Sequence, residues 1–236
     1  MRLLVISDLH ICNGDSFGTF GWSDKDFIKV LKKIIKKNKV DQVILNGDIY
    51  ELYKYEYEDI KKQHKDIIKY FKKLKCIYIC GNHDFLCDHG VTHYTIENTQ
   101  GQKIHIEHGH KADFMNGTLL GRFIVYLFFK FMKFAMRFQC IHRIYFGFME
   151  KDEELVSPRR YDSYKYLRYA MKLLKEYDVV ILGHTHRIEA HKTYRMHHKK
   201  RYLNSGSCSF GRFQGVLLDT ESLRYETFKL DKVEVI

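Results

Sequence analysis

Short apolar runs alternate with amphipathic stretches in the first half of this chain, and each run ends in a polar cluster. The first three runs cover residues 3–6, 43–45 and 77–80. The clusters that follow them are Ser7-Asp8-Leu9-His10, Gly47-Asp48 and Gly81-Asn82-His83-Asp84. Strands that alternate with helices predict an α/β fold with a parallel sheet, in which ligands bind beyond the carboxyl ends of the strands.

The remaining elements follow from hydrophobic spacing. Residues 24–38 and 60–74 place apolar side chains at helical spacing opposite lysines, which predicts one helix in each. The strands expected after them occupy residues 93–96, 103–107, 179–182, 189–195, 216–218 and 224–230. The first two of these form a hairpin, because the residues between them have turn composition.

Seven side chains in the polar clusters are carboxylates, amides or imidazoles at strand ends. They are Asp8, His10, Asp48, Asn82, His108, His184 and His186. Each one alone has a structural explanation as a turn, cap or surface residue, but independent turns do not explain five such clusters. Mixed oxygen and nitrogen ligands suit Mn²⁺, Fe²⁺ or Zn²⁺, and seven ligands match two metals that share a carboxylate. Strand alternation would place Asp8 and His10 on one side, and likewise His184 and His186.

Five motifs occur in order along the chain. They are Asp8-Leu9-His10, Gly47-Asp48, Gly81-Asn82-His83-Asp84, His108 and Gly183-His184-Thr185-His186. These motifs resemble those of the calcineurin-like metallophosphoesterases. The resemblance implies a four-layer α/β/β/α sandwich. It also implies one metal on Asp8, His10, Asp48 and His186, and a second on Asp48, Asn82, His108 and His184, with Asp48 as the bridge.

The resemblance predicts a metal-dependent phosphoric ester hydrolase. Two dications on the order of 3.5–4 Å apart lower the pKa of a bridging water, and the resulting hydroxide attacks a phosphate ester or pyrophosphate. The expected cofactors are therefore two divalent ions, with Mn²⁺ favoured over Fe²⁺ or Zn²⁺. The leaving group then needs a proton, and His83, beside Asn82 but outside the ligand set, is the candidate donor. Asp84 either orients the His83 imidazole or caps a helix.

Residues 114–149 differ in composition from the rest of the chain. They contain no Asp or Glu, and nine of the 17 Phe. We predict a helical cap at about 112–160, inserted into a single domain spanning residues 1–236 and followed by a helix at 160–176. One helical face would carry Leu127, Phe131, Phe134 and Phe138, with a stripe of Lys130, Lys133 and Arg137 about 100° away. Such a helix is a lid, an acyl-chain pocket, an interfacial membrane anchor or a plain core helix.

The substrate class is less constrained than the chemistry. Within the family, the chain length and the basic, aromatic insertion resemble the UDP-2,3-diacylglucosamine hydrolases, which implies a nucleotide- or lipid-linked substrate. Those enzymes typically carry Arg where this chain has His83, and His83 favours a more general phosphoesterase with an acid catalyst. The alternatives are a nuclease, a general phosphomonoesterase or protein phosphatase, and a non-catalytic protein-binding scaffold. Scaffolds of this fold generally lose ligands, whereas all seven are present here.

Charge and composition bear on partners and compartment. A formal net charge of +11 favours anionic partners: a phosphorylated substrate, a lipid surface or, less favoured, nucleic acid. The longest unbroken apolar run, residues 123–129, is far below the roughly 18 residues that a spanning helix needs. Six cysteines without a paired pattern favour reduced thiols. We therefore expect a soluble, cytoplasmic protein, with peripheral contact to an anionic membrane through residues 114–149.

Overall fold

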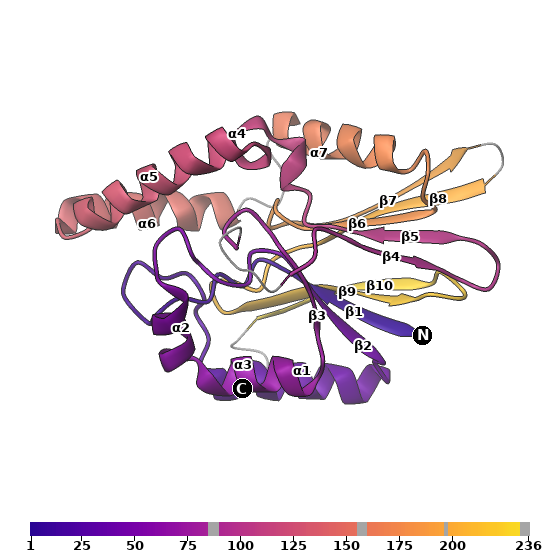
Figure 1. Ribbon diagram of the computed structural model, residues 1–236, viewed down its shortest axis with the longest axis horizontal. Helices are drawn as coiled ribbons and strands as arrows, with labels where there is room; N and C mark the ends of the chain where they lie inside the picture. The colour runs from indigo at the N-terminus through magenta and orange to yellow at the C-terminus, as the bar shows by residue number, and fades with distance from the viewer. Residues whose placement is uncertain (85–89, 155–159, 196–197, 232–236) are drawn as a thin grey trace.

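Two five-stranded sheets lie face to face in the computed structural model, which describes residues 1–84, 90–154, 160–195 and 198–231 (Figure 1). The strand orders are β10-β9-β1-β2-β3 and β4-β5-β6-β8-β7. The first sheet contains β1 (Arg2–Ile6), β2 (Gln42–Asn46), β3 (Ile77–Ile79), β9 (Arg212–Asp219) and β10 (Tyr225–Asp231). The second contains β4 (Tyr94–Glu97), β5 (Lys103–Ile106), β6 (Val179–Leu182), β7 (Ile188–Arg195) and β8 (His198–Ser205).

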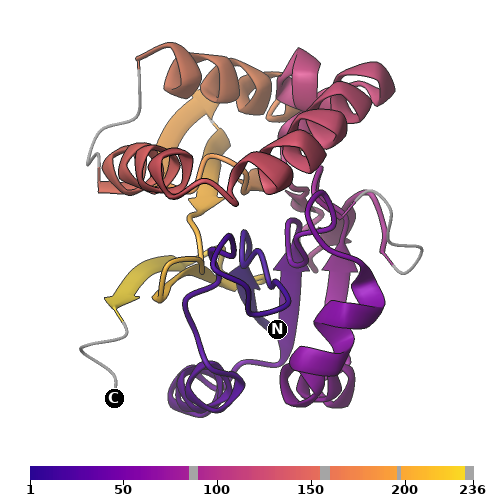
Figure 2. The same cartoon turned by 90° about the vertical axis from the view of Figure 1, so that its left-hand side faces the viewer.

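Helices cover the outer faces of both sheets, as Figure 2 shows from one end of the strands. On the side of the first sheet lie α1 (Asp24–Asn38), α2 (Tyr57–Gln63) and α3 (Lys65–Lys73). On the side of the second sheet lie the 3₁₀ turn η1 (His110–Ala112), α4 (Phe114–Gly117), α5 (Leu119–Ala135), α6 (Gln139–Glu154) and α7 (Arg160–Leu173). The order of layers is helix, sheet, sheet, helix, which confirms the predicted α/β/β/α sandwich.

Strand β1 belongs to the cores on both faces of the first sheet. Leu4 and Ile6 pack in the cluster shared with α1 and α3, whereas Leu3 and Val5 pack between the two sheets. All four side chains are fully buried. Because successive side chains on a strand point to opposite faces, an unbroken apolar run is what a strand in this position requires.

Both sheets are mixed, whereas the sequence predicted a parallel one. β1 pairs in parallel with β2 but antiparallel with β9, and a short turn makes β9 and β10 an antiparallel pair. β8 was not predicted, because its first half is the polar stretch His198-Lys199-Lys200-Arg201. It lies between β6 and β7 and pairs with both. The other predicted strands are confirmed with shifted ends.

The helix predicted at 60–74 is divided into α2 and α3 at His64. This residue has φ −114° and ψ 44°, outside the helical range. Its Nδ1 donates to Asp24 Oδ1, and the other carboxylate oxygen of Asp24 accepts from the Ile67 N–H at 3.1 Å. Asp24, the first residue of α1, thus satisfies a free amide in the first turn of α3.

Helices α4, α5 and α6 fall within the segment predicted to form a cap. In Figure 1, α5 and α6 extend past the carboxyl ends of β5, β6 and β8 in the second sheet. In the described ranges, no helix combines the length and the apolar character needed to cross a membrane. The division into one domain with an inserted cap stays a prediction.

Asn98 joins the turn between β4 and β5 to the first sheet through hydrogen bonds. Its buried Oδ1 accepts from the N–H groups of Gln100 and Gln102 at 3.0 and 2.9 Å, and its Nδ2 donates to the carbonyl oxygen of Thr220 at 3.0 Å. Asn98→Ala leaves these groups without partners, so we expect the free energy of unfolding to fall by about 1–3 kcal/mol in chemical denaturation. The control is Gln100→Ala, an exposed position in the same turn. Equal losses in both variants would contradict this role.

Candidate metal centre

The seven predicted ligands lie in loops at the same edge of the two sheets. Asp8 and His10 follow β1, Asp48 follows β2 and Asn82 follows β3. His108 follows β5, and His184 and His186 follow β6. β1 and β2 are parallel neighbours, as are β5 and β6, so the carboxyl ends of each pair meet. In Figure 1 these ends face the side on which α5 and α6 extend.

Five of the seven ligand residues adopt a left-handed backbone conformation. The φ angles are 54° at Asp8, 50° at His10, 53° at Asp48, 70° at His184 and 58° at His186. None of them lies in a strand, so strand alternation does not place these pairs, although Asp8 and His10 do lie in the same group. This conformation costs a non-glycine residue roughly 1–2 kcal/mol. Hydrogen bonds between loops hold it: the N–H groups of Asp8 and His10 donate to the carbonyl oxygens of Gly47 and Asp48 at 3.0 Å.

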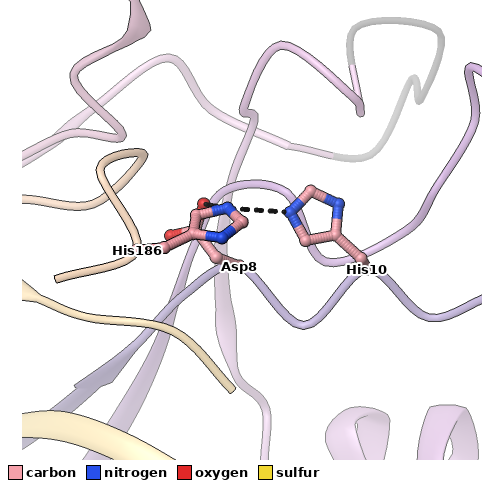
Figure 3. A group of neighbouring side chains, drawn as sticks. All are labelled: Asp8, His10 and His186. Carbon is pink, nitrogen blue, oxygen red and sulfur yellow. Dashed lines mark hydrogen bonds and ion pairs between the residues drawn. The ribbon is translucent and has the colours of Figure 1, made fainter. Parts of the chain in front are cut away.

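The first group of candidate ligands is Asp8, His10 and His186 (Figure 3). His10 Nε2 and His186 Nε2 face each other at 3.2 Å. His186 Nε2 also lies 3.2 Å from Asp8 Oδ1. Two imidazole nitrogens and a carboxylate oxygen turned toward one another form a donor set that a cation can join.

The second group is Asp48, His108 and His184. His108 Nδ1 donates to the carbonyl oxygen of Asn46 at 2.8 Å, which directs its Nε2 toward Asp48 Oδ2, 3.1 Å away. A hydrogen bond from the other ring nitrogen to a backbone carbonyl is typical of metal-binding histidines. Asp48 also lies within 4.8 Å of His10 in a third group, so it is the carboxylate that reaches both sides of the centre.

Asn82 adds an amide oxygen to the centre. Its Oδ1 is buried and accepts no hydrogen bond from the residues that the structure describes, while the neighbouring His83 N–H donates to Asp48 Oδ1 at 2.8 Å. A buried carbonyl oxygen without a donor is costly, and a cation is the partner that such an oxygen can take. The donor atoms of this centre therefore fit two divalent ions.

The carboxylates at the centre stay ionised although they are buried. Burial alone would raise the pKa of Asp8, but the imidazoles of His108 and His186 outweigh it and lower the pKa to about 2. Burial would lower the pKa of His108, but the carboxylates of Asp48 and Asp8 raise it to about 9. Two carboxylates that stay ionised in a buried site attract cations strongly.

Glu51 is a buried member of the site that the sequence analysis did not identify. Its Oε1 accepts from His83 Nδ1 at 2.7 Å, and its Oε2 lies 3.2 Å from Lys54 Nζ and 3.4 Å from His10 Nδ1. Burial would raise the pKa of Glu51, but His83 and Lys54 hold it well below its usual range. The signal in the sequence was two charged residues inside the apolar and aromatic stretch 49–55.

The structure places Asp84 away from the His83 ring. Its carboxylate accepts from the backbone N–H groups of Ile49 and Tyr50 at 3.0 and 2.7 Å, and burial together with Asp48 raises its pKa to about 7. Asp84 therefore joins the loop after β3 to the loop after β2, and the partner of the His83 ring is Glu51. The expectation that Asp84 orients His83 needs this correction. The helix-cap alternative involves residues 85–89, outside the described part of the chain.

Comparisons with known proteins agree with this geometry. Residues 1–188 match the family model of the calcineurin-like phosphoesterases. A UDP-2,3-diacylglucosamine hydrolase of Blochmanniella pennsylvanica is 25% identical over 218 residues, which cover 83% of each chain. The structure of a dimetal phosphatase from Danio rerio superposes with a TM-score of 0.55 and 9% identity, covering 99% of this chain and 97% of that one. At this identity the likeness concerns the fold.

Asp48→Asn tests whether the Asp48 carboxylate bridges the two metal ions. Replacing one shared carboxylate oxygen with an amide should weaken both metal positions, so we expect metal content to fall from about two ions per chain to below one, with turnover lost. Elemental analysis of the Mn²⁺-loaded protein measures this, and Asp66→Asn on the exposed side of α3 is the matched control. Retention of two metals by the Asp48→Asn protein would show that Asp48 does not bridge.

Proposed function

The chain belongs to the calcineurin-like phosphoesterase family, and we propose that it hydrolyses a phosphate ester or pyrophosphate with two divalent metal ions at the candidate centre. One observation carries this proposal. Carboxylate, amide and imidazole groups from five separate loops converge in a buried site, where Asn82 Oδ1 has no hydrogen-bond donor among the described residues. Metal ligands of this kind suit a dinuclear hydrolase better than a mechanism without metal.

In this proposal the ligands divide between two ions. One ion is held by Asp8, His10, Asp48 and His186, and the other by Asp48, Asn82, His108 and His184. The mixture of carboxylate, amide and imidazole donors favours Mn²⁺, with Fe²⁺ and Zn²⁺ as alternatives. When bound, two dications supply Lewis acidity toward phosphate oxygens and acidify water.

His83 is the proposed proton donor to the leaving group. Its Nδ1 donates to Glu51, so its Nε2 is turned toward the centre, 4.0 Å from Asp48 Oδ2. Burial would lower the pKa of His83, but Glu51 and Asp48 raise it above its usual value, which favours the protonated ring at neutral pH. A protonated imidazole beside a reacting phosphate is the state that general acid catalysis needs.

The cap helix α5 supports a lipid-linked substrate. Phe129 of α5 lies with its ring centre 5.7 Å from that of His83 and 5.7 Å from that of Tyr53, so apolar cap residues border the proposed reaction site. The relative named UDP-2,3-diacylglucosamine hydrolase adds a precedent for such a substrate at 25% identity. A general phosphomonoester is the second candidate, favoured by the His83–Glu51 pair, which serves any leaving group that needs a proton.

The outer face of α5 supports peripheral contact with an anionic membrane. Leu127, Phe131 and Phe134 are 50%, 64% and 56% exposed, so the alternative of a plain core helix is wrong for this face. Lys130 and Lys133 of this helix line a cavity of about 510 Å³ together with Arg137, which follows the helix. Lys130 pairs with Glu56 at 3.4 Å and Lys133 donates to the carbonyl oxygen of Lys54 at 2.9 Å, so the exposed apolar side chains supply the main contact with acyl chains.

His83→Ala tests the proton donor. We expect both metals to stay bound and turnover of phenyl phosphate to fall about 10²–10⁴-fold, because phenolate departs slowly without a proton. The loss should be much smaller for p-nitrophenyl phosphate, whose leaving group departs unprotonated. Steady-state kinetics on the two esters measure this, and equal losses would assign His83 to substrate positioning.

The double variant Leu127→Glu, Phe131→Glu tests the membrane contact. Each apolar side chain contributes on the order of 1.5–3 kcal/mol when fully buried, so co-sedimentation with vesicles rich in phosphatidylglycerol should fall at least about tenfold. The matched control is Tyr194→Glu, since Tyr194 is 71% exposed on β7, far along the chain from the cap. Failure of the unaltered protein to bind these vesicles, or an equal loss in the control, would refute the contact.

A further inference from the structure

Lys54 is a buried lysine between the candidate metal centre and the cap. Its side chain is 3% exposed, and its Nζ lies 3.2 Å from Glu51 Oε2. The same Nζ lies 4.3 Å from the ring centre of Phe17 and 5.0 Å from that of Phe129. Removing an ammonium group from water is costly, and a carboxylate with two aromatic faces offsets that cost at this site.

The two oxygens of Glu51 have different partners. Lys54 determines which of these oxygens faces His83. Oε2 lies beside Lys54 Nζ, while Oε1 accepts from His83 Nδ1 at 2.7 Å. His10 Nδ1 competes for the carboxylate, since it lies 3.4 Å from Oε2. Because Lys54 holds Oε2, the carboxylate cannot rotate so that both of its oxygens bind His10. The His83 ring therefore stays in the orientation that turns Nε2 toward the centre.

Residues of the cap complete the surroundings of Lys54. Phe129 of α5 stacks on Tyr53 with an angle of 15° between the rings, and it also borders His83. Phe17, on the other side of the ammonium, packs edge-on against Tyr145 of α6 at 5.1 Å. Both long cap helices thus contribute to the pocket in which Lys54 is held.

We propose that Lys54 is a positioning residue for proton transfer: it fixes the Glu51 carboxylate on His83 and links that pair to the cap. This inference rests on the proposed role of His83 as proton donor. Lys54 touches neither the metal ligands nor the reacting phosphate in this arrangement, so its effect passes through Glu51. It follows that a loss of the Lys54 charge weakens acid catalysis and leaves metal binding intact.

The experiment compares Lys54→Met, Lys54→Arg and Lys61→Met on two esters. We expect Lys54→Met to retain both metals and to lower kcat for phenyl phosphate about 10-fold or more, with less than about a threefold loss on p-nitrophenyl phosphate. Lys54→Arg keeps the charge and should recover most of the phenyl phosphate activity. Lys61→Met is the matched control, because Lys61 pairs with Glu58 at the same i,i+3 spacing on the exposed surface.

The outcomes separate this inference from the proposed function. If His83→Ala loses activity selectively on phenyl phosphate while Lys54→Met loses it equally on both esters or not at all, the role of Lys54 is overturned and that of His83 stands. If His83→Ala shows no selectivity, the acid role fails, and the positioning role fails with it. A lysine needed only for folding would not produce a loss that depends on the leaving group.

Phe17→Leu covers the case in which Lys54→Met does not fold. This variant removes the nearer of the two rings and leaves Lys54, Glu51 and His83 in place. We expect a selective loss on phenyl phosphate of about threefold or more, because the ammonium is held less firmly. Equal activity of Phe17→Leu and the unaltered protein on both esters would overturn the inference.

Discussion

Two buried carboxylates, Asp8 and Asp48, impose the constraint on which the rest of this structure depends. They are 0% and 1% exposed, and the charge of Asp48 opposes ionisation of Asp8. The parallel pairing of β1 with β2 brings the loops that carry them together. Imidazoles from the second sheet supply the compensating interactions, so the two sheets must meet at this edge with their loops in register. The left-handed backbone of the ligand residues is the local cost of that convergence.

Sequence reasoning placed the candidate ligands at strand ends because each motif has the same physical origin. A carboxylate, amide or imidazole directly after a short apolar run marks the end of a buried strand, and parallel strands bring their ends together. That reasoning did not extend to backbone detail: a positive φ at Asp8 or His186 leaves no pattern in a single sequence. It also missed β8, since the polar residues at 198–201 hide a strand that is buried only in its second half.

Glu51 and Lys54, which the sequence analysis did not identify, share one property: each contacts other side chains of the site and is not itself a candidate metal ligand. Glu51 and Lys54 carry charges inside the stretch 49–55, where Ile49, Tyr53 and Tyr55 are buried. Hydrophobic patterning treats such charges as exposed residues, whereas here the carboxylate and the ammonium compensate each other. A series of alternating charges leads outward from the centre: the Asp48 carboxylate, the His83 imidazole, the Glu51 carboxylate and the Lys54 ammonium. It ends at the aromatic rings of Phe17 and Phe129, which need no counter-charge. Each charged group in the series is stabilised by its neighbours.

Helix α5 has two apolar sides with different surroundings. Its inner side places Phe129 and Tyr126 against Tyr53, with ring centres 5.7 and 6.5 Å apart. On the outer side, Phe128 and Phe131 are 54% and 64% exposed. Within the described residues, the apolar side chains on the inner side of α5 pack against Tyr53, whereas those on the outer side are exposed. The Phe129 ring, which borders His83 and Lys54, is therefore placed by the contacts on the inner side of α5.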